Sequence, residues 1–141
     1  MSPIDSKRTW RRASALAGAM ALSTVLAACS GPKPEVGVAD PAPTRVVNGV
    51  LTGANGKTLY TSERDVTDSG KSSCLGDCAV AWPPLTATGD SGKGDYTVIT
   101  RPDNSKQWAY RGKPLYYFSR DVAAGDIMGE GVANVWHVAR P

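Results

Sequence analysis

The sequence has very few of the residues that catalytic and metal sites usually require. Of its 141 residues, one is a histidine, His137, and three are cysteines. No serine lies in a nucleophile-elbow pattern, and no glycine-rich phosphate loop follows a strand and opens a helix. A lone histidine on a strand is usually structural or exposed. The sequence therefore predicts a protein that is not an enzyme, with no catalytic residue and no cofactor.

The chain also lacks an apolar run long enough for an ordinary membrane-spanning helix. The uncharged run at 13–28 has 16 residues, whereas a spanning helix needs about 20. A basic segment with Lys7, Arg8, Arg11 and Arg12 precedes this run, and small residues end it at Leu26-Ala27-Ala28-Cys29. This order is typical of a lipoprotein signal peptide, which we place at residues 1–28.

The mature protein is then expected to begin at Cys29, with lipid on its sulfur, in the bacterial cell envelope. Its predicted partner is the membrane, because two or more acyl chains anchor a protein stably. Ser30 favours the outer membrane in a host with two membranes. Otherwise the protein lies on the outer face of the plasma membrane. The pair Arg11-Arg12 leaves twin-arginine export open beside the general secretory route.

The mature chain has no excess of charge of either sign. The whole chain has 16 Lys and Arg against 13 Asp and Glu, of which the signal peptide holds four and one, leaving 12 of each. No basic patch is therefore available for nucleic acid, which we exclude as a partner. An envelope protein or a small molecule remains open.

Proline and cysteine divide the mature chain. Residues 29–45 contain four prolines and little to bury, which predicts an extended tether. Residues 46–141 are long enough for one small domain. Of the cysteines, Cys74 and Cys78 remain for this domain, and an oxidising compartment favours a disulfide between them. A loop this short contributes only about 2 kcal/mol, enough to hold a local turn.

A metal or redox role for the same sulfurs is the alternative. Copper carriers also use two cysteines at this spacing, completed by a distant histidine, here His137, with Met128 as a further soft ligand. Calcium at Asp121, Asp126 and Glu130 is another alternative, although the spacing matches no EF-hand loop.

The domain contains an internal repeat with an offset of 56 residues. The segments 56–66 and 112–122 align without a gap and are identical at seven of eleven positions. We place repeat 1 at about 46–85 and repeat 2 at about 96–139. Trp82 and Trp136 end the two repeats at similar places.

The repeats read as antiparallel β-structure. We expect a strand over 46–52 that enters an Asn55-Gly56 hairpin and a strand over 57–61 that leaves it. In repeat 2, strands over 106–110 and 114–118 flank Arg111-Gly112, where arginine favours another turn type. Further strands are expected at 96–100 and 134–139. Residues 74–82 form the one expected helix, which Pro83-Pro84 ends. The fold class is a mainly β domain.

Alternation along the strands assigns side chains to two faces. Leu59 and Leu115 share one face, while Tyr60, Tyr116 and Phe118 share the other. Asp65 and Asp121 each follow an arginine at a strand end, where a carboxylate commonly accepts backbone N–H bonds and orders a turn. The candidate ligand or motif residues are Tyr60, Asp65, Trp82, Trp108, Tyr116, Phe118, Asp121 and Trp136.

Several of these motifs recur in order in one family. They are the lipobox Leu26-Ala27-Ala28-Cys29, two copies of Gly-x-x-Leu-Tyr followed by Asp, the segment from Ser73 to Pro84, and the segment from Gln107 to Tyr116. With these motifs the chain resembles bacterial lipoproteins described as a secreted repeat of unknown function, with a Tyr-x-aromatic-x-x-Asp motif. Repeat 2 matches this motif, whereas repeat 1 has Ser62 in place of the aromatic. The resemblance implies a location and a fold and carries no activity.

Three functional hypotheses follow. The leading one is a lipid-anchored, non-enzymatic binding or scaffolding module of the envelope. The second is a copper-handling or thiol-redox lipoprotein that uses Cys74, Cys78 and His137. The third is electron transfer along the aromatic rings, which requires a bound cofactor.

Overall fold

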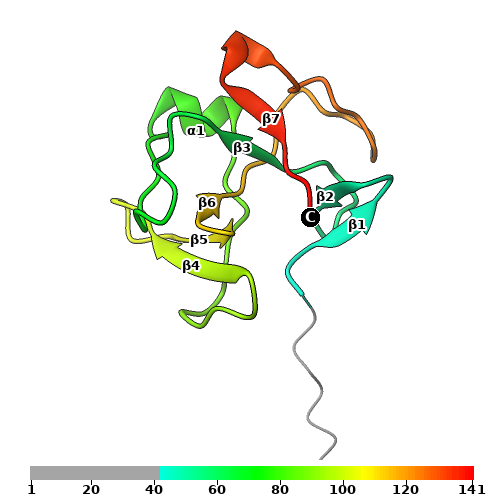
Figure 1. The fold of residues 1–141 in the computed structure, drawn as a ribbon. Helices are drawn as coiled ribbons and strands as arrows, with labels where there is room; N and C mark the ends of the chain where they lie inside the picture. The colour runs from blue at the N-terminus through cyan, green and yellow to red at the C-terminus, as the bar shows by residue number, and fades with distance from the viewer. Residues whose placement is uncertain (1–41) are drawn as a thin grey trace, which may run out of the picture. The chain divides into compact units, whose positions relative to one another are not determined.

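The computed structural model describes residues 42–141, which form seven short strands and one short α-helix (Figure 1). The strands make three antiparallel sheets, in the orders β1-β2, β3-β7 and β4-β5-β6. The prediction of a mainly β fold with two repeats and one short helix is confirmed. The predicted signal peptide, Cys29 and the predicted tether up to residue 41 lie outside the described residues. No helix in 42–141 is long and apolar enough to cross a bilayer. The elements are β1 (Arg45–Val47), β2 (Val50–Thr52), β3 (Tyr60–Ser62), α1 (Asp77–Ala81), β4 (Tyr96–Thr100), β5 (Lys106–Tyr110), β6 (Lys113–Pro114), the 3₁₀ turn η1 (Val132–Asn134) and β7 (Trp136–Val138).

The prediction of a single strand over 46–52 is wrong, because this segment contains a turn between two strands. Asn48 and Gly49 both have positive φ, at 51° and 77°, and β1 pairs with β2 around them. Two consecutive positive φ angles suit a tight hairpin, and an Asn-Gly pair adopts them at low cost. A second turn at Asn55-Gly56 follows, closed by a 3.0 Å bond from Gly53 N to Lys57 O.

The turn between β5 and β6 is also tighter than predicted. Arg111 has φ 46° and Gly112 has φ 77°, so arginine occupies the left-handed region that a different turn type would have avoided. Arg111 Nε donates to Asp95 Oδ2 at 3.0 Å, and its guanidinium lies 4.9 Å from the centre of the Tyr110 ring. Both contacts are exposed to solvent, so they compensate part of the strain of a left-handed arginine.

The helix and the last strand are shorter than predicted. The helix α1 covers Asp77–Ala81 rather than 74–82, because Gly76 at φ 56° and ψ −127° is not helical. The last strand, β7, begins at Trp136 rather than Asn134. Ala133 and Asn134 both have φ 54°, which no strand residue adopts.

The end of each repeat pairs with the other repeat. At the end of repeat 2, β7 pairs with β3 of repeat 1, with Ser62 opposite Trp136. Figure 1 shows these two strands side by side. At the end of repeat 1, Leu85 N donates to Leu115 O, and Trp108 N donates to Leu85 O, both at 2.9 Å. Each repeat therefore completes its hydrogen bonding only through the other.

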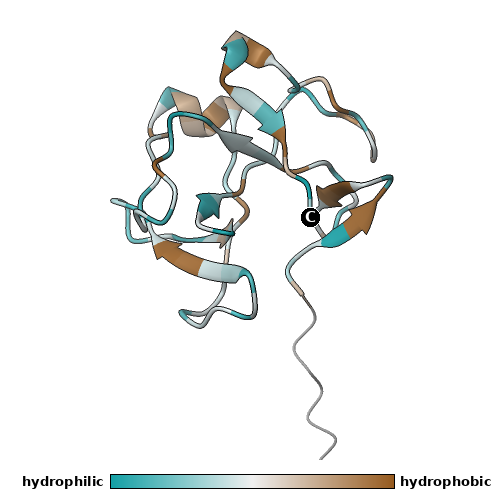
Figure 2. Ribbon diagram, in the orientation of Figure 1, coloured by the Kyte–Doolittle hydropathy of each residue, from teal (hydrophilic) through white to brown (hydrophobic). Residues whose placement is uncertain are grey.

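The predicted alternation of faces is confirmed by two separate hydrophobic clusters. Leu59 and Leu115 lie in a cluster of aliphatic residues, while the adjacent Tyr60 and Tyr116 lie in a cluster of rings. In Figure 2, β3 is pale, yet its Tyr60 is fully buried. The aromatic cluster contains Tyr60, Cys74, Trp82, Tyr116, Phe118, Trp136 and Val138, and the aliphatic cluster contains Leu51, Leu59, Leu85, Leu115 and Ala139.

We predict that Gly129→Ala destabilises the domain by about 1–3 kcal/mol, the usual cost of overpacking a core. A Cβ at this position would lie 2.8 Å from the Trp82 ring and 2.9 Å from the Tyr60 ring. Urea unfolding measures the loss. Gly89→Ala is the matched control, because nothing lies within 4 Å of its Cβ. Equal stability of the two variants would contradict the tight packing.

Candidate functional site

The two motif tyrosines and the two motif aspartates bond across the repeats. Tyr60 Oη of repeat 1 donates to Asp121 Oδ2 of repeat 2 at 2.7 Å. Tyr116 Oη of repeat 2 donates to Asp65 Oδ2 of repeat 1, also at 2.7 Å. All four residues are buried. We call these four residues, Tyr60, Asp65, Tyr116 and Asp121, the Tyr–Asp lock.

The backbone joins the lock at its centre. Tyr60 N donates to Tyr116 O at 2.8 Å, and Tyr116 N donates to Tyr60 O at 3.0 Å. The same two residues thus exchange a reciprocal pair of backbone bonds and send their hydroxyls to opposite repeats. The arrangement has the approximate two-fold symmetry expected of a duplicated unit.

The second oxygen of each aspartate orders the loop that follows it. Asp65 Oδ1 accepts bonds from the backbone N–H and the hydroxyl of Ser73, both at 2.7 Å. Asp121 Oδ1 accepts a bond from Met128 N at 3.0 Å. Each carboxylate therefore closes a loop within its own repeat while binding the tyrosine of the other.

Burial raises the pKa of Tyr60 well above the usual value of a phenol, and the hydrogen bond to Asp121 adds to this effect. Burial likewise raises the pKa of Tyr116, and its bond to Asp65 acts in the same direction. Both hydroxyls consequently stay protonated and act as donors to the carboxylates.

Between the two halves of the lock lies a stack of aromatic rings. Trp82 and Trp136, at equivalent positions of the two repeats, stack with centroids 3.8 Å apart and planes 6° apart. Phe118 stacks against Trp82 at 4.3 Å. The rings of Tyr60 and Tyr116 meet Trp82 and Trp136 edge-on, at 5.4 and 5.1 Å. Trp82 therefore stacks against two rings, those of Phe118 and Trp136.

Trp108 is not part of this stack. Its ring lies edge-on to Tyr96 at 6.4 Å, where it packs against the aliphatic cluster. The structure thus brings seven of the eight candidate residues together and leaves Trp108 apart.

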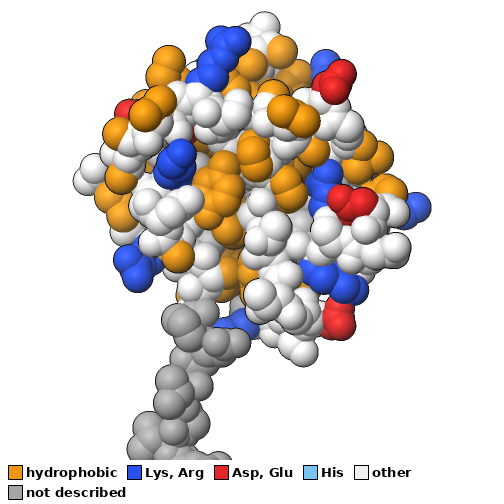
Figure 3. All heavy atoms as spheres, turned by 180° about the vertical axis from the view of Figure 1, so that it is seen from behind, with side chains coloured by type: hydrophobic (Ala, Val, Ile, Leu, Met, Phe, Trp, Pro, Cys, Tyr) orange, Lys and Arg blue, Asp and Glu red, His pale blue; other side chains and the backbone are white. Residues whose placement is uncertain are grey.

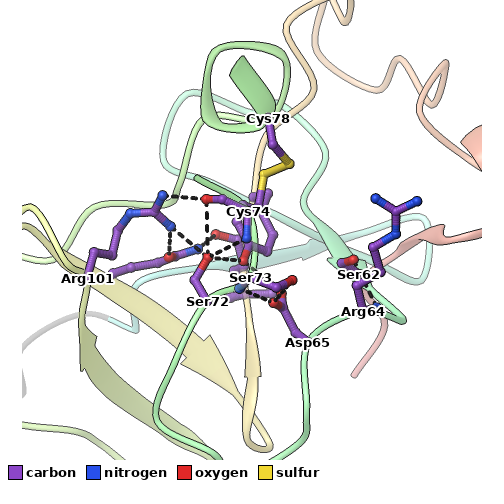
Figure 4. Close-up of a disulfide and its surroundings, with 11 residues drawn as sticks. Ser62, Arg64, Asp65, Ser72, Ser73, Cys74, Cys78 and Arg101 are labelled. Carbon is purple, nitrogen blue, oxygen red and sulfur yellow. Dashed lines mark hydrogen bonds between the residues drawn. A yellow bond between two sulfur atoms is a disulfide. The ribbon is translucent and has the colours of Figure 1, made fainter. Parts of the chain in front are cut away.

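A buried arginine completes the network and was not predicted from the sequence. Arg101, which is 4% exposed, donates from Nη1 to Gln107 Oε1 at 2.7 Å and to Ser72 Oγ at 2.9 Å, and from Nη2 to Cys74 O at 2.6 Å (Figure 4). Because the proton of Tyr116 Oη goes to Asp65, the 2.7 Å contact between Ser72 Oγ and Tyr116 Oη has serine as the donor.

The network places a buried cation two hydrogen bonds away from the tyrosine that binds Asp65. None of the ion pairs in the described domain includes Arg101, so its charge is compensated through neutral acceptors. A buried charge is tolerated only when its hydrogen bonds are satisfied. In the sequence, Arg101 stands before Pro102 at a turn and carries no signal that distinguishes it from an exposed charge.

The cysteines and the histidine occupy separate places. The disulfide between Cys74 and Cys78 joins the segment before α1 to α1 itself, which contains Cys78 (Figure 4). His137 Nδ1 lies 3.0 Å from Glu130 Oε1, and Glu130 Oε2 accepts a bond from Val138 N at 2.6 Å. The backbone bond and His137 lower the pKa of Glu130. Within residues 42–141 no three His, Cys, Asp or Glu side chains are grouped as metal ligands, so the copper set is not assembled.

The calcium candidates are likewise used within the chain. Asp126 Oδ2 accepts bonds from Val122 N and Ala123 N, both at 2.8 Å. Asp121 belongs to the Tyr–Asp lock, and Glu130 binds β7. Each carboxylate therefore orders its own piece of backbone.

An open, largely apolar groove lies beside the ring stack. It has a volume of about 720 Å³, and two of its side chains, Val80 and Met128, are 75% and 63% exposed. Trp82 and Phe118 reach it from the core. We call this surface the groove; it is lined by Asp77, Val80, Ala81, Trp82, Phe118, Ser119, Arg120, Met128 and Val132.

The groove residues outside the core were not predicted as a site. The repeat predicted Trp82 and Phe118 as motif residues, whereas Met128 was expected only as an alternative copper ligand. Asp77, Val80 and Arg120 lie on α1 and on the turn after Phe118, and only the fold brings them together. Phe118 lines this groove, and repeat 1 has Ser62 in its place. This difference between the repeats is the signal in the sequence that could have indicated the groove.

Comparison with known proteins places the repeats in a described family. A family model for a secreted repeat of unknown function matches residues 45–86 and 97–140, which is more than half of the chain. No curated protein and no solved structure matches the chain.

We predict that Tyr60→Phe lowers the free energy of unfolding by about 1–3 kcal/mol at neutral pH, because it leaves a buried carboxylate oxygen without its donor. Above about pH 10, unfolded tyrosines lose protons that folded Tyr60 and Tyr116 retain, so the unfolding free energy of the wild type falls as pH rises. Denaturant unfolding at pH 7 to 11 measures both effects, and Tyr60→Phe should show a shallower alkaline fall.

Tyr110→Phe is the control for this experiment. Its hydroxyl makes no hydrogen bond within the described domain, so its removal should change the stability at neutral pH by less than about 0.5 kcal/mol. Equal losses in the two variants would show that the Tyr60 hydroxyl contributes nothing specific.

Proposed function

Since the chain belongs to the family of secreted repeats of unknown function, as its motifs predicted, we propose that its mature form is a lipid-anchored, non-enzymatic binding module of the bacterial cell envelope. In this proposal Cys29 carries the lipid, the Tyr–Asp lock holds the two repeats together, and the groove receives the ligand.

The proposal that the groove is the binding surface rests on the contrast between the buried motif residues and the open groove. The tyrosines and carboxylates of the repeated motif, which the sequence offered as ligand residues, point inward and bind each other. The groove, in contrast, has an apolar lining open to solvent and polar side chains with no partner inside the described domain. A concave apolar surface with a few polar groups is the usual form of a ligand site.

The geometry around the single histidine supports a non-enzymatic role. His137 is engaged by Glu130 and is not among the residues that line the groove. Catalysis by a general base needs that base within hydrogen-bond reach of the reacting group. A ligand in the groove would not meet an imidazole.

The charge distribution on the face of the domain drawn in Figure 3 supports a partner other than nucleic acid. Figure 3 shows one face, on which Lys and Arg side chains are scattered around hydrophobic ones and mixed with Asp and Glu. Nucleic-acid binding needs basic side chains gathered into a patch or stripe.

We expect Cys29→Ser to abolish lipid attachment, because a hydroxyl cannot replace the thiol that receives the diacylglyceryl group. Labelling of cells with an alkyne palmitate should mark the wild type and leave Cys29→Ser unmarked, and the variant should move from the membrane fraction to the soluble fraction of the envelope. Labelling that persists in the variant would overturn the lipid anchor.

We also expect a photoreactive benzoylphenylalanine in place of Val80 to cross-link in cells to a ligand of defined mass. The same substitution of Val66 is the matched control, because Val66 is 71% exposed against 75% for Val80 and lines a different hollow, which we call the Val66 hollow. Mass spectrometry of the purified protein measures the adducts. Equal labelling at both positions, or none at Val80, would rule out the groove as the binding surface.

A further inference from the structure

Two opposite charges face the groove without a partner. Arg120 and Asp77 both line it, and neither makes a hydrogen bond or an ion pair within the described domain. They do not approach each other closely enough to form a salt bridge. A cation and an anion held apart over one apolar surface are complementary to a ligand that carries both charges.

The lining between these charges suits a flexible aliphatic chain better than a planar ring. Phe118 and Trp136 both stack against Trp82, so Trp82 has no free face for a sugar or a base. Val80, Ala81 and Val132 are aliphatic, and Met128 is an adaptable side chain that fits irregular apolar ligands.

We propose that the groove binds a zwitterionic phospholipid. Arg120 holds the phosphate, Asp77 holds the ammonium group, and one acyl chain lies along Val80, Met128 and Val132. This inference rests on the proposed function and specifies its ligand.

The place of the domain relative to Cys29 favours a lipid over a peptide. Fifteen residues, 30–44, lie between Cys29 and the start of β1 at Arg45. A chain of this length reaches about 55 Å at most, so a lipidated protein keeps the groove close to the bilayer that contains its ligand. The volume of about 720 Å³ lies within the range of small-molecule sites.

The repeat supplies a matched control. Arg64 is the repeat-1 counterpart of Arg120, 56 residues earlier. It lines the Val66 hollow, together with Asp65 and Ser69, instead of the groove. Removing its charge changes the protein's net charge by the same amount without touching the site.

The test uses the mature chain, residues 29–141, with Cys29→Ser so that no attached lipid fills the groove. Backbone amide NMR follows titration with dihexanoyl-phosphatidylethanolamine below its micelle concentration. We expect shifts centred on α1 and Met128. Dihexanoyl-phosphatidylglycerol, which lacks the ammonium group, should bind about tenfold more weakly, the effect of one charge-assisted hydrogen bond. Phosphoethanolamine alone should bind more weakly still.

The variants separate the two charges. Asp77→Asn should remove the preference for the ethanolamine lipid, Arg120→Gln should weaken both lipids about tenfold, and Arg64→Gln should change neither. Both groove positions are exposed, and an unchanged amide spectrum away from the groove verifies that each variant folds.

Other results overturn the inference in distinguishable ways. If the two lipids bind equally and Asp77→Asn has no effect, the ligand need not be zwitterionic, and the proposed binding function still stands. If phosphoethanolamine binds as tightly as the lipid, the acyl chain does not contribute to binding. No lipid binding, together with a peptide adduct at position 80, identifies a peptide ligand. If no lipid binds and position 80 gives no cross-linked adduct, the proposed binding function itself is wrong.

Discussion

The hydrogen bonds from each tyrosine hydroxyl to the aspartate of the other repeat are the interaction on which the rest of the structure depends. A buried carboxylate is costly unless its oxygens are paired, and here one oxygen of each aspartate finds its donor only in the other repeat. The other oxygen orders the loop that leads toward Trp82 or Trp136. The lock thus joins the repeats, positions the loops and supports the Trp82–Trp136 stack at once.

What the two repeats share builds the scaffold, and what they do not share builds the groove. The lock, the paired tryptophans and the exchanged terminal segments occur in both repeats. Phe118 has Ser62 as its counterpart, and the helix α1 with Asp77 and Val80 occurs in repeat 1, where repeat 2 has the η1 turn. Duplication therefore supplied a stable core, and the divergence of the copies left an apolar surface with two unpaired charges beside it.

Much of the local structure could be predicted because it depends on near neighbours in the chain. The strands at Tyr96–Thr100 and Lys106–Tyr110 have the predicted bounds, and the alternation of Leu59 with Tyr60 follows from the two-residue period of a strand. The Asn48-Gly49 turn was missed, because the flanking valines read as one continuous strand. The positive φ of Arg111 was not predicted, because its hydrogen-bond partner Asp95 lies 16 residues earlier, just before β4, and reaches it only after folding.

By itself, the sequence determined the duplication, the β character, the two faces of the repeated strands and the residues of the motif, since each follows from local periodicity and from identity between the copies. Only the tertiary structure decided which aspartate each tyrosine binds, that Arg101 is buried against Ser72 and Gln107, and that Asp77 and Arg120 border one groove. The reason is that a hydrogen bond needs its partner within about 3 Å. The motif contains one tyrosine and one aspartate per repeat, so pairing within a repeat and pairing across repeats have the same sequence. The path of the chain, which brings the end of each repeat to the other, selects between them.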